Sequence, residues 1–146
     1  MQAIDYFDKA AETFPDRVAL VDGKSRYTYR ELRVASERLA RAIWAGGLRD
    51  EDRAAIYSPN DARVLVCMLG ILRAGGTWVP INYRNALDAN ADFMNYAEAR
   101  WLFYHSSFGE QVEELKSRVP ALRPRARFRR SAEWASVSGV RPPTAP

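Results

Sequence analysis

The chain has few of the side chains that perform chemistry in proteins. Its 146 residues include one cysteine, Cys67, and one histidine, His105. A single cysteine excludes an internal disulfide, and one histidine with one distant cysteine does not make a zinc site. Because a lone cysteine in an apolar helix is most often a small core residue, we expect Cys67 to be buried and to have no catalytic role.

The sequence also has no apolar run near the ~20 residues that a membrane-spanning helix needs. Its opening, MQAIDYFDKAAETF, has early acidic residues and no continuous apolar block, so it does not resemble a secretory signal. A protein with so little cysteine is typical of a reducing compartment. We therefore predict a cytoplasmic location and no membrane span.

The formal net charge of +4 is unevenly distributed. Residues 1–120 carry a net charge of −1, and residues 121–146 carry +5. Nucleic-acid-binding proteins usually spread basic residues over a folded face. The run Arg123–Arg130 leaves contact with RNA, DNA or anionic lipid open, but a solvated tail is the favoured interpretation, and we expect no nucleic-acid partner.

The first third of the chain predicts a helix, a short hairpin and a second helix. Apolar residues recur at helical spacing over 2–14. A short apolar run at 18–22 and a second short strand at 26–28 flank an Asp-Gly turn. Thr28 and Glu31 have the spacing of a capping box, which opens a helix that should end at the next Gly-Gly pair, residues 46–47.

Strands and helices then alternate up to Pro120. We expect Asn60 to cap the second of these elements and Ser107 with Glu110 to form a capping box at the last. Alternation of this kind predicts an α/β fold with a mainly parallel sheet and helices on its faces. The predicted elements are a strand at 53–57, a helix at 61–74, a strand at 78–81, a helix near 88–97, a strand at 101–104 and a final helix.

The remaining residues, 121–146, show no apolar period and contain four prolines. Such a composition does not repay the entropy lost when a chain becomes ordered. We therefore predict one folded domain, residues 1–120, followed by a basic, proline-rich tail, residues 121–146, that is disordered or loosely docked.

Three other patterns invite a functional interpretation, and each has a simpler one. His105 and Ser107 form two thirds of a triad, but nothing supplies the third member, so we favour a loop or capping role for His105. The carboxylates at 50–52 precede a strand and favour a solvated loop over a cation site. An aromatic ligand groove is conceivable, but aromatic residues on strands and at helix–sheet seams belong more often to the core. These aromatic residues are Tyr27, Tyr29, Tyr57, Tyr83, Tyr96, Tyr104, Trp44, Trp78, Trp101 and Trp134.

Four stretches together resemble the adenylate-forming (AMP-binding) enzymes, the family of acyl-CoA synthetases, luciferases and nonribosomal adenylation domains. Residues 27–32 (YTYREL) and 72–82 (LRAGGTWVPIN) resemble the family's first two core motifs, which are regarded as structural. Residues 52–60 (DRAAIYSPN) resemble its D-R-V-A stretch, and residues 80–84 (PINYR) resemble the P-[LI]-N-x-R of the acyl-CoA synthetase branch. The resemblance covers residues 1–120 and implies an incomplete N-terminal subdomain of a fatty-acyl or related acyl-CoA ligase.

The resemblance also implies chemistry that this sequence does not contain. Members of the family use ATP and Mg²⁺ to join a carboxylate to AMP, and then pass the acyl group to CoA. The phosphate loop, the aromatic-Thr-Glu motif, the ribose-binding Asp and the late catalytic Lys have no counterpart here. We therefore assign no catalytic, cofactor-binding or metal-binding residue, expect no cofactor for this piece, and expect a scaffold role without activity of its own.

Two further expectations concern partners and origin. We expect the apolar face that would meet the remainder of the enzyme to be exposed, so that it either binds that remainder or drives self-association. A truncated or frameshifted gene product is a hypothesis that the downstream DNA would test. A non-catalytic interaction module is the alternative function, and nucleic-acid binding through the tail is the least favoured one.

Overall fold

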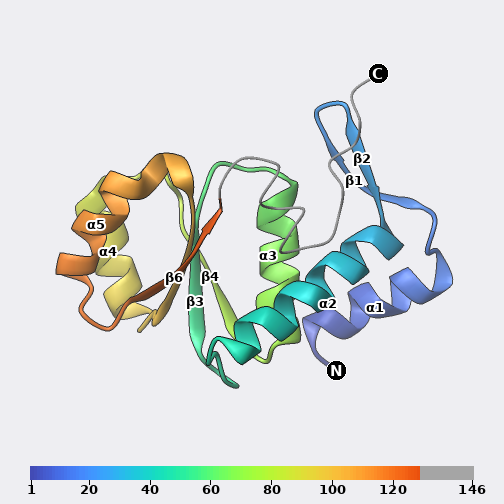
Figure 1. Cartoon of the computed structure of the whole chain (residues 1–146), viewed down its shortest axis with the longest axis horizontal. Coiled ribbons are helices and arrows are strands. Elements are labelled where there is room, and N and C mark those ends of the chain that lie inside the picture. Colours follow the sequence, from blue (N-terminus) through green and yellow to red (C-terminus); the bar gives the residue numbers. More distant parts are fainter. Residues whose placement is uncertain (129–146) are drawn as a thin grey trace.

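The computed structural model describes residues 1–128 and consists of three layers (Figure 1). A four-stranded parallel sheet lies in the middle, with strand order β4-β3-β5-β6. Helices α1, α2 and α3 lie on one side of the sheet, and α4 and α5 lie on the other. The predicted α/β class, with a short hairpin and a mainly parallel sheet, is confirmed.

The N-terminal elements follow the predicted order: α1 (Ala3–Thr13), β1 (Val18–Asp22), β2 (Ser25–Thr28) and α2 (Tyr29–Ala45). The predicted capping box at the start of α2 is present. The amide of Glu31 donates to the Thr28 hydroxyl at 3.2 Å, and the amide of Thr28 donates to the Glu31 carboxylate at 2.7 Å. These two hydrogen bonds satisfy amides that the first turn of a helix leaves free.

The remaining elements build the sheet and its covering helices. They are β3 (Arg53–Tyr57), α3 (Ala62–Arg73), β4 (Thr77–Pro80), α4 (Leu87–Tyr96), β5 (Trp101–His105), the 3-10 turn η1 (Ser106–Phe108), α5 (Gly109–Arg118) and β6 (Arg123–Phe128). The predicted helices and strands of this region agree with these bounds to within one or two residues. Among residues 1–128, no helix is both long enough and apolar enough to cross a membrane.

Alternation along the strands separates two apolar cores. In β3, Ala54 and Ile56 pack toward α2 and α3, and Ala55 and Tyr57 pack toward α4 and α5. In β5, Phe103 belongs to the first core and its neighbours along the strand alternate in the same way. Both faces of a parallel sheet are normally covered, and these strands are accordingly apolar on both sides.

Helix α3 lies between the sheet and α2 and has no exposed residue. Cys67 lies in its centre and is fully buried, as predicted. Burial raises the pKa of its thiol well above the usual range, so the thiolate that would react is disfavoured.

Gly75 ends α3 in the conformation that the sequence predicts for a glycine stop. Its φ is +82°, and a Cβ at this position would overlap the carboxylate of Asp50. The Gly75 carbonyl also accepts a hydrogen bond from the amide of Glu51 at 2.9 Å. Glycine is therefore required both for the backbone conformation and for the close approach of the loop before β3.

One strand follows residue 120, the predicted end of the folded domain. Strand β6 lies beyond it and pairs in parallel with β5, with a register shift immediately after Pro124. An edge strand tolerates a proline because one side of its backbone needs no partner, and hydrogen bonding to β5 replaces the apolar pattern that the segment lacks. Residues 129–146, and with them the rest of the predicted tail, lie outside the described residues.

Two predicted helix caps are wrong. Asp61, rather than Asn60, caps α3, since its carboxylate accepts from the Arg63 amide at 2.8 Å. Ser107 and Glu110 form no capping box, because the chain first makes the η1 turn and α5 begins only at Gly109. A capping signal read from spacing alone does not reveal which of two adjacent polar residues has the extended backbone of a cap.

The carboxyl edge of the sheet as candidate functional site

The carboxyl ends of the strands form the edge where a parallel α/β sheet most often holds ligands. The loop after β3 leads to α3 on one face, and the loops after β4 and β5 lead to α4 and α5 on the other face. Such a divergence leaves a crevice beyond the strand ends. Residues 58–61, 81–86 and 105–108 follow these strand ends and supply the groups that could bind or react there.

His105 ends β5 and caps the η1 turn, as predicted. Its Nδ1 lies 2.7 Å from the Ser107 hydroxyl and accepts the Ser107 amide at 3.2 Å. Burial lowers the pKa of His105, the positive charge of Arg63 lowers it further, and Asp61 opposes them. A histidine whose Nδ1 is held by backbone and hydroxyl donors is oriented as a cap.

The third member of a triad is missing among the described side chains. Asp61 is the carboxylate whose charge acts on His105, but its oxygens bind Arg63 through the side chain at 2.9 Å and through the amide. The structure therefore brings His105 and Ser107 together without a carboxylate that orients the imidazole. A hydroxyl activated by a histidine–carboxylate pair needs both contacts.

The amino terminus of α3 also points to this edge, where a phosphate would be favoured by free amides and the helix dipole. Two carboxylates already occupy it. Asp61 caps the Arg63 amide, and Asp22, from the hairpin, accepts from the Ala62 amide at 2.9 Å. This helix therefore has no free anion cradle, and its first amides serve instead to fix the hairpin to the sheet domain.

On the other face, a polar network organises the loop after β4. The buried Asn90 donates to the carbonyl of Asn82 at 3.0 Å and shares a hydrogen bond with Tyr57. Burial raises the pKa of Tyr57, and the hydrogen bond to Asn90 opposes that effect. The side chain of Asn85 reaches Asn90 at 3.4 Å. Sequence reasoning missed this network, because one asparagine in the middle of a helix gives no signal of burial.

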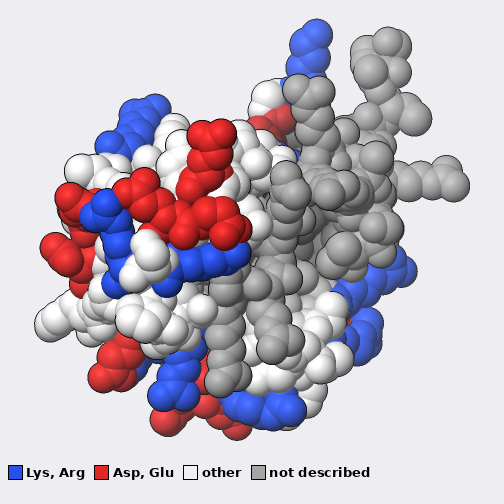
Figure 2. Space-filling view, turned by 60° about the vertical axis from the view of Figure 1, so that its left-hand side comes forward, with Lys and Arg blue, Asp and Glu red and all other residues white. Residues whose placement is uncertain are grey.

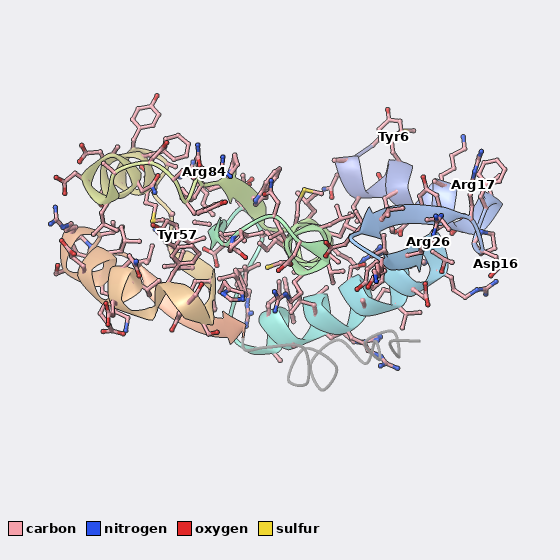
Figure 3. The ribbon with its side chains drawn as sticks, turned by 90° about the horizontal axis from the view of Figure 1, so that it is seen from above. Tyr6, Asp16, Arg17, Arg26, Tyr57 and Arg84 are labelled. Atoms are coloured by element: carbon pink, nitrogen blue, oxygen red, sulfur yellow. The ribbon has the colours of Figure 1, made fainter. Side chains whose placement is uncertain are left out.

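Aromatic rings cover the same region. Phe108 packs edge-on against Tyr57, with ring centroids 4.8 Å apart, and lies 5.7 Å from Tyr83. The guanidinium of Arg84 stacks over the Tyr83 ring at 5.5 Å. Figure 3 shows Tyr57 and Arg84 at this end of the molecule, on neighbouring elements. These contacts form an aromatic rim of Tyr57, Tyr83 and Phe108, with Arg84 as an exposed cation beside it. The rim can support a binding surface, but these four residues contain no acid–base pair.

The other predicted candidates lie away from this edge. Asp52 accepts from the Arg49 amide at 2.9 Å and from the Trp101 indole at 3.2 Å, so it orders the loop before β3. No group of three or more metal-ligating side chains occurs within residues 1–128. Most of the aromatic residues that were predicted to lie in the core, and that the structure describes, are buried or half-buried. The prediction is wrong for Trp44 and Tyr96, whose exposed fractions are 46% and 87%.

Charges are intermixed on the face around α4 and α5. Figure 2 shows red and blue side chains side by side there. Several charged residues of α4 and α5 form ion pairs. Arg118, for example, binds Asp88 and Glu114. Among residues 1–128, the charges on this face therefore alternate in sign and do not form a continuous basic patch of the kind that binds a phosphate backbone.

Comparison with known proteins identifies the family. The family model described as AMP-binding enzyme matches residues 7–140. The chain belongs to the AMP-binding enzyme family. The resemblance of residues 27–32, 52–60, 72–82 and 80–84 to adenylate-forming enzymes is thereby confirmed.

Several relatives show how much of such an enzyme the chain matches. A medium/long-chain-fatty-acid–CoA/3-oxocholest-4-en-26-oate–CoA ligase from Mycolicibacterium smegmatis is 34% identical over 112 residues, which are 77% of this chain and 19% of that protein. Tyrocidine synthase 3 from Brevibacillus parabrevis is 30% identical over 106 residues, or 73% of this chain and 2% of the synthase. The chain thus spans about a fifth of the ligase it matches.

Solved structures agree with the fold. The apo structure of MbtA from Mycobacterium smegmatis matches with a TM-score of 0.80 and 29% identity, covering 100% of this chain and 28% of that one. The N-terminal domain of FACL13 from Mycobacterium tuberculosis matches with a TM-score of 0.82 and 19% identity, covering 100% and 37%. The second likeness is one of fold alone.

Proposed function

We propose that this AMP-binding family chain acts as the N-terminal scaffold of an ATP-dependent acyl-CoA ligase, and that it does not adenylate an acid by itself. The scaffold would hold the carboxyl edge of its sheet against the part of the enzyme that binds ATP, Mg²⁺ and CoA. The observation that carries this proposal is the occupied amino terminus of α3, where Asp22 and Asp61 take the place that a phosphate would need.

The remaining chemistry of the edge supports the same proposal. His105 is engaged as a cap, and Asp61 is engaged by Arg63. Adenylation needs donors placed at the phosphates and cations that neutralise the developing charge. Residues 1–128 offer Arg84 as an exposed cation beside the aromatic rim, which falls short of such a set. We therefore assign the segment no cofactor of its own.

The acid is proposed to be a fatty acid or a related hydrophobic carboxylate. Residues 80–84 (PINYR) follow the pattern of the acyl-CoA synthetase branch, and the named ligase relatives act on medium- and long-chain fatty acids. Nonribosomal synthetases match the chain at comparable identity, so the choice of branch rests on this short stretch. A cytoplasmic location stays a prediction.

The proposed lack of activity is tested by acid-dependent pyrophosphate release. The purified chain is incubated with ATP, Mg²⁺, CoA and a panel of fatty and aromatic acids, with the M. smegmatis ligase as the positive control. We expect no release above the no-acid background for this chain. Release that depends on an added acid and saturates with it would contradict the proposal.

The scaffold role also predicts how the isolated chain behaves. Large apolar side chains that are 43–87% exposed include Tyr6, Phe14, Val21, Trp44, Phe93 and Tyr96. Exposed apolar surface of this kind is a common feature of interfaces, so we expect the chain to bind a hydrophobic dye or to self-associate. Light scattering after size-exclusion chromatography gives the oligomeric state, and dye fluorescence and a thermal melt complete the test. A sharply melting monomer that binds no dye would contradict both the missing partner and the interaction-module alternative.

A further inference from the structure

Asn90 is the one buried amide side chain among those that the structure describes. It is 1% exposed and lies in α4, where its neighbours Ala91 and Met94 belong to the second apolar core. Burying an amide costs free energy unless hydrogen bonds satisfy it, whereas an apolar side chain of the same shape would stabilise such a core. A polar residue that the core does not need is typical of a position retained for function.

The hydrogen bonds of this amide lead to the carboxyl edge of the sheet. Asn90 Nδ2 donates to the carbonyl of Asn82 at 3.0 Å, and Oδ1 accepts from the Asn85 side chain at 3.4 Å. The third partner is the hydroxyl of Tyr57, at the end of β3. One buried side chain thereby connects α4, the last residue of β3 and the loop after β4.

The loop, residues 81–86, is shaped by its own turn but is attached to the sheet from outside. The Asn82 side chain accepts from the amide of Arg84 at 3.0 Å, and its carbonyl accepts from the amide of Asn85 at 3.1 Å. Residues 82 and 84–86 are exposed, so they contribute little packing of their own. The bond from Asn90 to the Asn82 carbonyl therefore fixes the backbone two residues before Arg84.

We propose that Asn90 is a positioning residue, which fixes loop 81–86 and with it the exposed Arg84 at the carboxyl edge. Figure 3 shows Tyr57 and Arg84 on the neighbouring elements that this side chain connects. The inference rests on the proposed function, because it is in the complete ligase that this edge would meet the parts that bind ATP and CoA. A leucine in place of Asn90 would suit the core and release the loop.

The test variant must not leave a buried group unpaired. Tyr57 is 2% exposed, so Asn90→Leu alone would strand its hydroxyl. The double variant Tyr57→Phe/Asn90→Leu removes both partners, and water can replace the lost bond at the exposed Asn82. Tyr57→Phe is the reference, since it keeps Asn90 on the loop. Asn95→Leu is the matched control, because Asn95 also lies on α4 but donates to the carbonyl of Arg118 at 2.9 Å.

Backbone NMR relaxation of the full chain shows whether the loop is fixed. In Tyr57→Phe and in Asn95→Leu, the order parameters of residues 82–86 should stay at about 0.85, the value of rigid backbone. In the double variant they should fall below about 0.6, while those of β3 and α4 stay unchanged. The Tm of the double variant should equal or exceed that of Tyr57→Phe, because the core exchanges an amide for an apolar side chain.

Two outcomes on the full chain would overturn the inference. One is a set of order parameters for residues 82–86 that is the same in the double variant and in Tyr57→Phe. The other is a Tm of the double variant more than about 5 °C below that of Tyr57→Phe, which would make Asn90 a structural residue of the core.

Activity is measured in a complete enzyme, a chimera in which this chain replaces the segment of the M. smegmatis ligase that it matches. The double substitution should lower kcat/KM for acyl-CoA formation at least about tenfold relative to Tyr57→Phe, without lowering the Tm. Equal values of kcat/KM would also overturn the positioning role. An unsubstituted chimera without activity would contradict the proposed function instead, and the order parameters of the full chain would then decide this inference.

Discussion

Asp22 and Ala62 are 40 residues apart, and the carboxylate of Asp22 accepts the first amide of α3 at 2.9 Å. This bond fixes the β1–β2 hairpin to the sheet domain and satisfies an amide that would otherwise need a ligand or water. One residue thereby joins two structural units and closes a candidate anion site. The relationship leads to the first of five predictions.

Asp22→Ala should lower the free energy of unfolding by about 1–2 kcal/mol, because it removes a charge-assisted cap at a half-buried position. Asp16→Ala is the matched control, since Asp16 is also bonded, to Arg30, but is 80% exposed and should change stability by less than about 0.5 kcal/mol. Urea denaturation followed by circular dichroism gives both values. Equal effects would show that the α3 contact adds nothing.

The ion pair between Asp8 and Arg73 predicts a loss of stability in acid. Arg73 donates to both oxygens of Asp8, at 2.8 and 2.6 Å, and its hydrogen bond is the main reason why the pKa of Asp8 is lowered, against the opposing effect of burial. The folded state then binds fewer protons than the unfolded state. The stabilisation is present above about pH 4 and is lost as the pH falls through the lowered pKa.

Asp8→Asn should remove that dependence on pH. The variant should be less stable than the parent at pH 7 by about 2 kcal/mol, and the difference should shrink toward pH 2 as Asp8 becomes protonated in the parent. Thermal unfolding at a series of pH values measures the convergence. Parallel curves from pH 7 to pH 2 would rule out a contribution from the Asp8 carboxylate.

Alanine substitutions at Gly23 and Gly75 distinguish two destabilising effects of a side chain at positive φ, which are backbone strain and steric overlap. Gly23 has a φ of +58°, and no atom lies within 4 Å of the place that a Cβ would take, so Gly23→Ala should cost about 1 kcal/mol from backbone strain alone. Gly75→Ala adds an overlap with Asp50 and should cost more than about 3 kcal/mol. The double variant Gly75→Ala/Asp50→Ala should recover part of the loss, and a failure to recover any of it would contradict the packing argument.

A glycine in place of Glu98 should stabilise the fold, which is the reverse of the losses expected when Gly23 or Gly75 is replaced by alanine. It follows the last turn of α4 with a φ of +50°, and the next amide, of Ala99, donates to the Met94 carbonyl as in a glycine-terminated helix. Glu98→Gly should raise the free energy of unfolding by about 0.5–1 kcal/mol, although it removes the exposed ion pair with Arg53. Glu98→Ala, which loses the same ion pair at a similar φ cost, is the control and should not be stabilising.

The sequence predicted most elements because their signals are local. The Thr28–Glu31 capping box, the glycine stop at Gly75 and the apolar alternation of β3 each depend on residues within a few positions. Two cap predictions failed locally, at Asn60 and Ser107, whereas the strand that the sequence did not predict depends on a distant partner. Strand β6 pairs with the open edge of β5, and its own residues show no apolar alternation that would predict a strand.

The candidate site was less predictable than the fold for the same reason. His105 was expected to cap, and it does, but the closure of the α3 amino terminus requires Asp22 to reach across 40 residues. Likewise, the burial of Asn90 depends on Tyr57 and on the loop after β4. Such contacts become visible only when the tertiary structure brings the partners together.

The central claim, that this chain is an interchangeable scaffold of an acyl-CoA ligase, is tested most directly by a chimera. In the M. smegmatis ligase, the segment that aligns with this chain is replaced by the corresponding residues of this chain, and acyl-CoA formation from a long-chain fatty acid is measured. The account predicts a kcat within about tenfold of the parent enzyme, since the groups that bind ATP and CoA are retained. A chimera that unfolds as cooperatively as the parent and forms no acyl-CoA would contradict it.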